Sequence, residues 1–117
     1  MTTGWSDPVA IPNDVLKYYE AATKKMGGIE KTKDFFRFFM APGMGHCGGG
    51  EGPDTFDKVK ALEDWVERGK APARFEASHS ANGRVDRTRP LCPYPQVARY
   101  SGTGSLDDAA SFSCKAP

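Results

Sequence analysis

Residues 35–53 read FFRFFMAPGMGHCGGGEGP and join a dense aromatic run to a glycine-rich run. The aromatic part, residues 35–41, is short, contains a single charge and ends at Pro42, which predicts a buried strand. The following part is dominated by glycine and must form a loop. A buried strand that leads into a loop of small residues is typical of α/β sheets, where reacting groups gather beyond the carboxyl ends of the strands.

Helices are predicted on both sides of this stretch. Residues 12–26 carry apolar side chains at helical spacing, with Pro12 suited to the first turn and glycines directly after the last residue. Asp54 has the character of an N-cap for a second helix, with Asp57 in its first turn and Gly69 at its end. The order helix, buried strand, loop, helix indicates the α/β class.

The two ends of the chain show weaker patterns. Residues 1–11 are predicted to be irregular, and residues 72–117 to be rich in turns, with short strands at residues 74–78 and 96–100. One strand does not make a sheet, and a strand as apolar as residues 35–41 needs covered neighbours on both sides. We therefore expect its parallel partner strands to lie outside this chain.

Composition limits the classes of function. The chain has 117 residues and a formal net charge of +1, which suits one small domain or part of a larger one. The near-neutral balance gives no electrostatic reason to expect a nucleic acid or an anionic membrane as partner. No apolar run approaches the roughly 18 residues that span a bilayer. The first residues have neither the basic nor the apolar region of a signal peptide.

His46 and Asp7 are the candidates for chemistry. His46 directly follows the predicted strand, on a loop whose glycines allow close approach to the ring. If a strand ends just before Gly4, Asp7 also lies beyond the carboxyl end of a strand, and an Asp that accepts the ring N–H of a His fixes its tautomer. The residues alone leave open that Asp7 is a turn residue before Pro8 and that His46 is an ordinary loop histidine.

A zinc site is a weaker alternative. Its ligands would be Asp7, His46, Cys47 and His79, but an adjacent His and Cys do not readily bind one ion and the usual spaced pairs are absent. His79 stands among small polar residues and is predicted to lie on the surface. Trp65 and the phenylalanines of residues 35–39 are predicted to belong to the core.

Segments along essentially the whole chain resemble, in order, the tannase and feruloyl esterase family. They are GWSDP at residues 4–8, FFRFFMAPGMGHC at 35–47, DWVERGKAP at 64–72, RPLCPYP at 89–95 and the tail that ends at Cys114. The resemblance implies a carboxyl-terminal fragment of an α/β-hydrolase fold: the last core strand, flanking helices and a turn-rich tail. Residues 1–117 would form the carboxyl-terminal part of the catalytic domain.

The resemblance also assigns roles within a Ser-His-Asp carboxylic ester hydrolase that acts on galloyl, feruloyl or related aromatic esters. Asp7 would be the acid and His46 the general base, and Cys47 would pair with a cysteine next to the nucleophilic Ser. The chain contains neither G-x-S-x-G nor a Cys followed by Ser. We therefore expect the Ser, the oxyanion hole, the lid and its calcium site in a missing amino-terminal portion, no cofactor in this chain, and no activity of the chain alone.

The three cysteines leave at least one thiol without a partner in the chain. Cys92 and Cys114 flank a turn-rich segment with little core of its own, and we predict a disulfide between them. The parent protein would then be secreted or periplasmic. Cys47 is predicted to be free and near the surface, beside an unpaired edge of the strand, so that the chain forms dimers or aggregates under oxidising conditions.

A different class of function stays open from the sequence. The chain could be a stand-alone remnant that acts as a binding or structural module without catalysis. An in-frame upstream extension that encodes Gly-x-Cys-Ser-x-Gly would show that the chain is part of an enzyme and not a stand-alone module.

Overall fold

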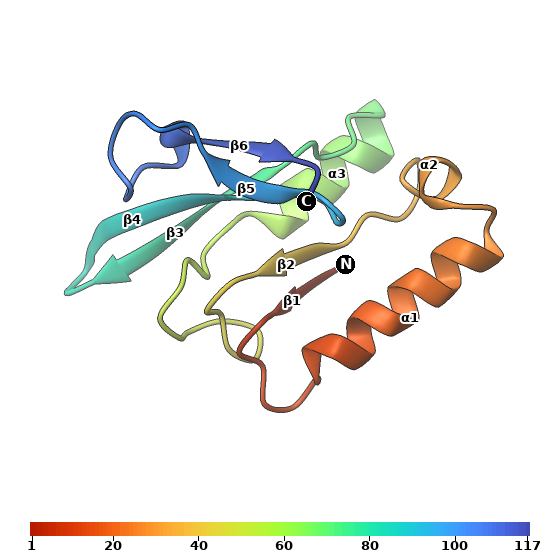
Figure 1. Ribbon diagram of the computed structural model, residues 1–117, viewed down its shortest axis with the longest axis horizontal. Helices are drawn as coiled ribbons and strands as arrows, with labels where there is room; N and C mark the ends of the chain where they lie inside the picture. The colour runs from red at the N-terminus through yellow and green to blue at the C-terminus, as the bar shows by residue number, and fades with distance from the viewer.

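Three two-stranded sheets and three helices build the chain in the computed structural model, which describes residues 1–117. In Figure 1, β1 and β2 lie in the middle, with α1 on one side and the other two sheets on the other. The chain is a small mixed α/β structure, with one parallel and two antiparallel pairs of strands. The elements are β1 (Thr2–Gly4), α1 (Pro12–Lys25), α2 (Ile29–Thr32), β2 (Phe39–Ala41), α3 (Lys58–Arg68), β3 (Phe75–Ala81), β4 (Arg84–Leu91), β5 (Val97–Tyr100), the 3₁₀ turn Ala109–Ser111 and β6 (Phe112–Lys115).

The first sheet consists of β1 and β2, which run parallel with Thr2 opposite Phe39 and Gly4 opposite Ala41. The prediction that residues 1–11 are irregular is therefore wrong at Thr2–Gly4, and the chain itself supplies one parallel partner for the buried strand. The free edge of this pair falls on β1, because Phe39 of β2 also makes an isolated bridge with Pro93. Since the strands share one direction, both carboxyl ends meet at one edge of the sheet.

The buried strand is shorter than the predicted residues 35–41. The backbone N–H groups of Phe35 and Phe36 both donate to the carbonyl of Thr32, so these residues complete the turn that follows α2. Phe35 is exposed, in contrast to the predicted core position. The extended pairing begins only at Phe39, where the backbone aligns with β1.

The aromatic run divides between two apolar contacts. The rings of Phe36 and Phe38 pack on Tyr19 of α1, with centroids 5.0 and 5.3 Å from its ring. Phe39 faces Phe75 of β3, with 4.7 Å between centroids. These contacts join the central pair of strands to α1 on one side and to the antiparallel pair of β3 and β4 on the other. The buried cluster on the hairpin side contains Phe39, Ala41, Met44, Ala77 and Leu91.

The two longer helices follow the sequence pattern with small corrections at their ends, whereas the sequence does not predict the short helix α2. α1 ends one residue before the predicted limit of residues 12–26. α3 begins at Lys58, and its N-cap is Asp57, whose carboxylate accepts the N–H of Lys60 at 2.9 Å. The predicted N-cap, Asp54, instead accepts a hydrogen bond from Gly49. Gly69 ends α3 in the left-handed conformation, as expected for a C-cap glycine.

α3 buries less of its apolar face than its spacing suggests. Val59, Leu62 and Val66 are exposed in this chain. Trp65, which was expected in the core, is half-buried, and the guanidinium of Arg37 lies over its ring at 5.4 Å. α3 thus contacts the rest of the chain through only a narrow strip of its side chains.

The tail contains two antiparallel hairpin sheets, and the strands expected at residues 74–78 and 96–100 are present as β3 and β5. β3 pairs with β4, and β5 pairs with β6. The strand expected at residues 74–78 extends to Ala81, and β4 and β6 were not predicted. The turn between β3 and β4 is Asn82-Gly83, both at positive φ, which matches the right-handed twist of a two-residue hairpin.

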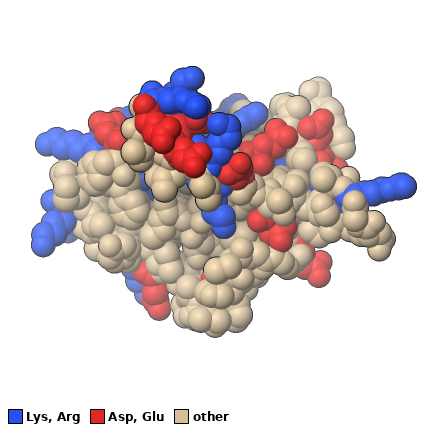
Figure 2. Space-filling model, turned by 180° about the vertical axis from the view of Figure 1, so that it is seen from behind, with Lys and Arg blue, Asp and Glu red and all other residues tan.

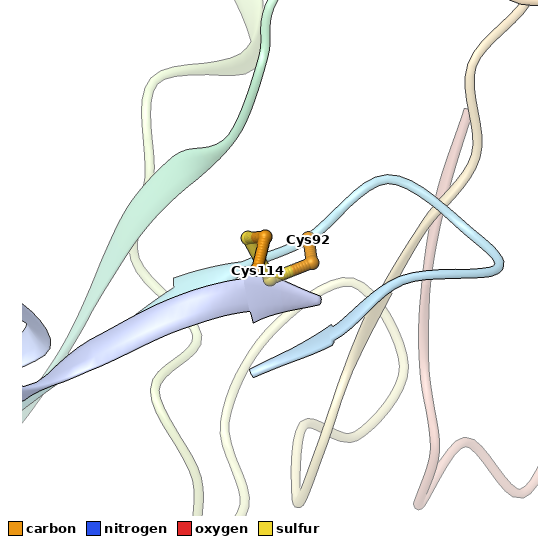
Figure 3. Close-up of a disulfide and its surroundings, with 2 residues drawn as sticks. All are labelled: Cys92 and Cys114. Carbon is orange, nitrogen blue, oxygen red and sulfur yellow. A yellow bond between two sulfur atoms is a disulfide. The ribbon is translucent and has the colours of Figure 1, made fainter. Parts of the chain in front are cut away.

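A disulfide joins the two hairpin sheets. Cys92, just after β4, is bonded to Cys114 of β6, with Cα atoms 5.5 Å apart (Figure 3). The predicted Cys92–Cys114 bond is therefore present in the structure. The bond ties β6 and its partner β5 to the end of β4.

Charges of both signs are mixed on the surface. On the face opposite to that of Figure 1, acidic and basic side chains gather along the upper part, and much of the remaining surface is uncharged (Figure 2). None of the helices combines the length and the apolar character that crossing a membrane requires.

Candidate active site

Asp7 and His46 meet where the two parallel strands end. β1 ends at Gly4 and β2 at Ala41, and each candidate residue lies a few positions further along its loop. Nδ1 of His46 lies 2.9 Å from Oδ2 and 3.1 Å from Oδ1 of Asp7. The structure thus brings together the two residues that the sequence singled out. β1 is the strand whose end near Gly4 was needed to place Asp7 beside His46.

The Asp7 carboxylate is held from two directions. Its Oδ1 accepts the backbone N–H groups of Val9 at 2.8 Å and Ala10 at 2.9 Å, which is the turn role that the sequence left open. The same carboxylate accepts the ring N–H of His46. Asp7 therefore stabilises the turn and accepts the hydrogen bond from His46 at the same time, because the turn fixes the carboxylate in the orientation that meets the ring.

The pKa of Asp7 is lowered from its ordinary value. Burial alone would raise this pKa, but the hydrogen bonds from His46, Val9 and Ala10 together outweigh burial. Asp7 is thus a carboxylate at neutral pH. A carboxyl group whose pKa falls on folding stabilises the fold above its ordinary pKa, and this contribution is lost as the pH drops through the lowered pKa.

The charge on Asp7 fixes the tautomer of His46. A carboxylate can only accept hydrogen bonds, so the proton of the neutral ring must be on Nδ1. Nε2 then carries the lone pair, and it makes no hydrogen bond within the chain. The side chain of His46 is 50% exposed while that of Asp7 is only 4% exposed, so the basic nitrogen belongs to the accessible member of the pair.

Gly4 allows the two loops to approach each other. The N–H of Ser6 donates to the carbonyl of Met44 at 3.0 Å, which joins the Asp7 loop to the histidine loop, defined here as residues 43–52. A Cβ on Gly4 would lie 2.1 Å from that carbonyl oxygen and 2.6 Å from the carbonyl oxygen of Gly45. The sequence motif alone gives no physical reason for a glycine at this position, and the close approach of the two loops supplies one.

The other residues that the sequence singled out take no part in the contact between Asp7 and His46. Cys47 is free and exposed, and it has a positive φ of 63°. His79 is not a fully exposed residue, since its Nδ1 contacts Asp86 Oδ1 across the hairpin at 2.6 Å and its side chain is mostly covered. Asp7, His46, Cys47 and His79 do not gather, and no three His, Cys, Asp or Glu side chains are arranged to hold a metal ion.

An ionised Asp that fixes a half-exposed His at the carboxyl edge of parallel strands is the arrangement by which α/β hydrolytic enzymes prepare a general base. The sequence profile described as "Tannase and feruloyl esterase" matches residues 1–115. The chain belongs to this family.

Individual relatives agree with the family assignment. The chain is 45% identical to the mono(2-hydroxyethyl) terephthalate hydrolase of Piscinibacter sakaiensis, over 97% of this chain and 19% of that protein. It is 31% identical to feruloyl esterase B of Aspergillus niger, over 95% of this chain and 24% of that protein. An esterase of Aspergillus oryzae shares the fold with a TM-score of 0.89 and 29% identity, over 97% of this chain and 26% of that one. The chain thus spans about a fifth to a quarter of the length of these relatives.

Proposed function

We propose that this chain supplies the acid and the general base of a serine-type carboxylic ester hydrolase. The observation that carries the proposal is the contact between Nδ1 of His46 and the carboxylate of Asp7, 2.9 Å apart. It leaves Nε2 as an accessible base supported by a buried negative charge. Membership of the tannase and feruloyl esterase family supports the same activity.

The nucleophilic Ser would come from outside these residues, since the chain has no G-x-S-x-G motif. Nε2 of His46 takes the proton of the Ser hydroxyl as its oxygen attacks the ester carbonyl. Asp7 stabilises the imidazolium that results, without itself taking the proton. Nε2 then gives the proton to the leaving alcohol or phenol, and a water molecule repeats the cycle on the acyl-enzyme.

Aromatic esters are the proposed substrates, of the galloyl, feruloyl or related hydroxyaryl kind. The relatives named for ferulate and for a terephthalate ester support this class. We also propose a secreted or periplasmic parent protein, which the Cys92–Cys114 disulfide supports because such bonds persist in oxidising compartments. The proposed partner is the amino-terminal portion of the catalytic domain that carries the Ser.

A chimeric enzyme tests the proposal. This chain replaces the segment that it matches in the mono(2-hydroxyethyl) terephthalate hydrolase. The chimera should hydrolyse that enzyme's own ester or the methyl esters of gallate and ferulate. Asp7→Ala should lower kcat by about 10⁴-fold and His46→Ala by about 10⁶-fold, the scales of loss for the acid and the base of such a triad.

His79→Ala is the matched control, because His79 also contacts a carboxylate but lies on the hairpin. It should leave kcat nearly unchanged. Turnover that survives His46→Ala in a folded chimera would contradict the proposal, and so would an inactive but folded chimera. The chain on its own should show no turnover above its His46→Ala variant. Turnover by the chain alone that His46→Ala abolishes would place the nucleophile within these residues.

A further inference from the structure

The histidine loop is closed by its own backbone but consists largely of glycine. The N–H of Gly45 donates to the carbonyl of Gly49 at 2.9 Å, and the N–H of Gly52 donates to the carbonyl of Gly43 at 3.2 Å. Glycine loses more conformational freedom on ordering than any other residue. A side chain on such a loop therefore holds one position only if the loop has a further restraint.

Two side chains from outside the loop bind its backbone. The Oδ2 atom of Asp54 accepts the N–H of Gly49 at 2.5 Å, and Arg87 donates to the carbonyl of Glu51 at 3.3 Å. The Asp54 contact is the shorter one and joins an ionised acceptor to a peptide N–H, a kind of hydrogen bond about twice as strong as a neutral one. The hydrogen bond from Gly49 is also the largest cause of a lowered pKa of Asp54, so the carboxyl is ionised at neutral pH.

Asp54 is itself fixed to β3. The N–H groups of Asp54 and Thr55 both donate to the carbonyl of Ser78 at 3.1 Å, and the N–H of Ser78 donates back to the carbonyl of Thr55 at 2.9 Å. The hydroxyl of Thr55 donates to Oδ1 of Asp54 at 3.1 Å. One carboxylate oxygen is therefore held by the segment that pairs with β3, and the other holds the loop.

We propose that Asp54 is a positioning residue for His46. By tying Gly49 to β3, its carboxylate holds the histidine loop in the conformation that places the ring of His46 on Asp7. Asp54 touches no reacting atom, and its importance for catalysis rests on the proposed function. Without this restraint the loop samples other conformations, and the fraction of molecules with the Asp7–His46 contact falls.

The test replaces Asp54 in the full chain and observes the site by NMR. In Asp54→Ala, the amide proton of Gly49 should exchange with solvent at least about tenfold faster, the change that corresponds to losing one charge-assisted hydrogen bond. The pKa of Asp7, measured on its carboxyl carbon, should rise toward the ordinary value because the hydrogen bond from His46 is weakened. The ring nitrogens of His46 should lose the signature of a fixed Nδ1–H tautomer.

Asp57→Ala is the matched control, because it also removes a single carboxylate-to-backbone hydrogen bond, the one that caps α3. It should lower the melting temperature and leave the pKa of Asp7 and the tautomer of His46 unchanged. Asp54→Asn keeps an oxygen acceptor without the charge, so it should restore part of each signal. If Asp54→Ala does not fold, Asp54→Asn carries the test and should give intermediate values.

Unchanged Asp7 and His46 signals in the folded variant would overturn the proposal. Equal changes in the Asp57→Ala control would overturn it as well, because they would show a general loss of stability. None of these measurements depends on ester hydrolysis. Failure of the positioning role is therefore distinguishable from failure of the proposed esterase function.

Discussion

At the scale of single residues, the site depends on atoms that restrain one another. The Asp7 carboxylate is oriented by the turn at Val9 and Ala10, and it then fixes the tautomer of His46. Because Asp7 holds the ring proton on Nδ1, the lone pair of His46 lies on Nε2 although no group of the chain contacts that nitrogen. In the proposed mechanism, the atom that accepts the proton is therefore prepared before any substrate arrives.

Gly4→Ala should separate the two loops. The added Cβ would lie 2.1 Å from the carbonyl oxygen of Met44, so the backbone must shift. We expect a loss of about 1–3 kcal/mol in the free energy of unfolding, the usual cost of inserting a methyl group where there is no room. The pKa of Asp7 should also rise as the contact with His46 weakens. Thermal unfolding and an NMR titration of Asp7 measure the two effects.

Gly48→Ala is the control for this prediction. Gly48 lies on the histidine loop itself, does not have a positive φ, and a Cβ there would meet its nearest atom, Oδ2 of Asp54, at an ordinary 3.6 Å. It should change both quantities much less than Gly4→Ala. Equal effects of the two substitutions would show that an added methyl group costs the same where the structure leaves room for it, and the specific role of Gly4 would be wrong.

At the scale of elements, the disulfide connects parts that share little core. Reducing it, or replacing Cys92 and Cys114 by Ser, should lower the free energy of unfolding by about 3 kcal/mol, the value expected for a closed loop of this length. The measurement is a denaturant titration with and without a reductant. A double variant as stable as the native chain would contradict the prediction, and Cys47→Ser controls for the effect of the reductant on the third thiol.

The elements that could be predicted are those whose pattern is local. α1 has helical apolar spacing and glycines at its end, so its bounds were nearly correct. β1 could not be predicted, since Thr2–Gly4 has no apolar pattern and exists through its pairing with β2. The β3–β4 hairpin did carry a local signal, the Asn82-Gly83 turn. Polar and apolar residues alternate only weakly in the strands that it joins, so the turn alone does not define the hairpin.

The same distinction applies to the candidate site. The segments around Asp7 and His46 were recognisable because they lie beside a strand end and match family motifs. The sequence predicts Asp54 as a helix cap, since its spacing to α3 fits that role almost as well as that of Asp57 does. Its contact with Gly49 depends on how the histidine loop folds back, which local sequence does not encode.

At the scale of the whole molecule, little of the chain is enclosed. Only 17 of 117 residues are buried, which is a small core, and apolar side chains of α3 are exposed. Cys47 is exposed as well, on the same loop as His46. These features favour association with another surface.

We expect disulfide-linked dimers of the chain under oxidising conditions. Cys47 is the one cysteine outside the intramolecular bond, so it should form the link. Non-reducing electrophoresis and size-exclusion chromatography should show dimers that a reductant converts to monomers and that Cys47→Ser does not form. A monodisperse monomer of the native chain in oxidising buffer would contradict this prediction and favour a self-sufficient module.

The contact between Asp7 and His46 has a consequence for how such proteins diverge. Most of the groups that establish it lie between β1 and Asp54, and the backbone of Ser78 in β3 holds this stretch at Asp54 and Thr55. In the proposed enzyme, mutations elsewhere can therefore alter which ester is recognised while the pair of Asp7 and His46 is inherited unchanged. This separation offers one reason why natural selection could produce, within a single family, proteins named for a terephthalate ester and for ferulate.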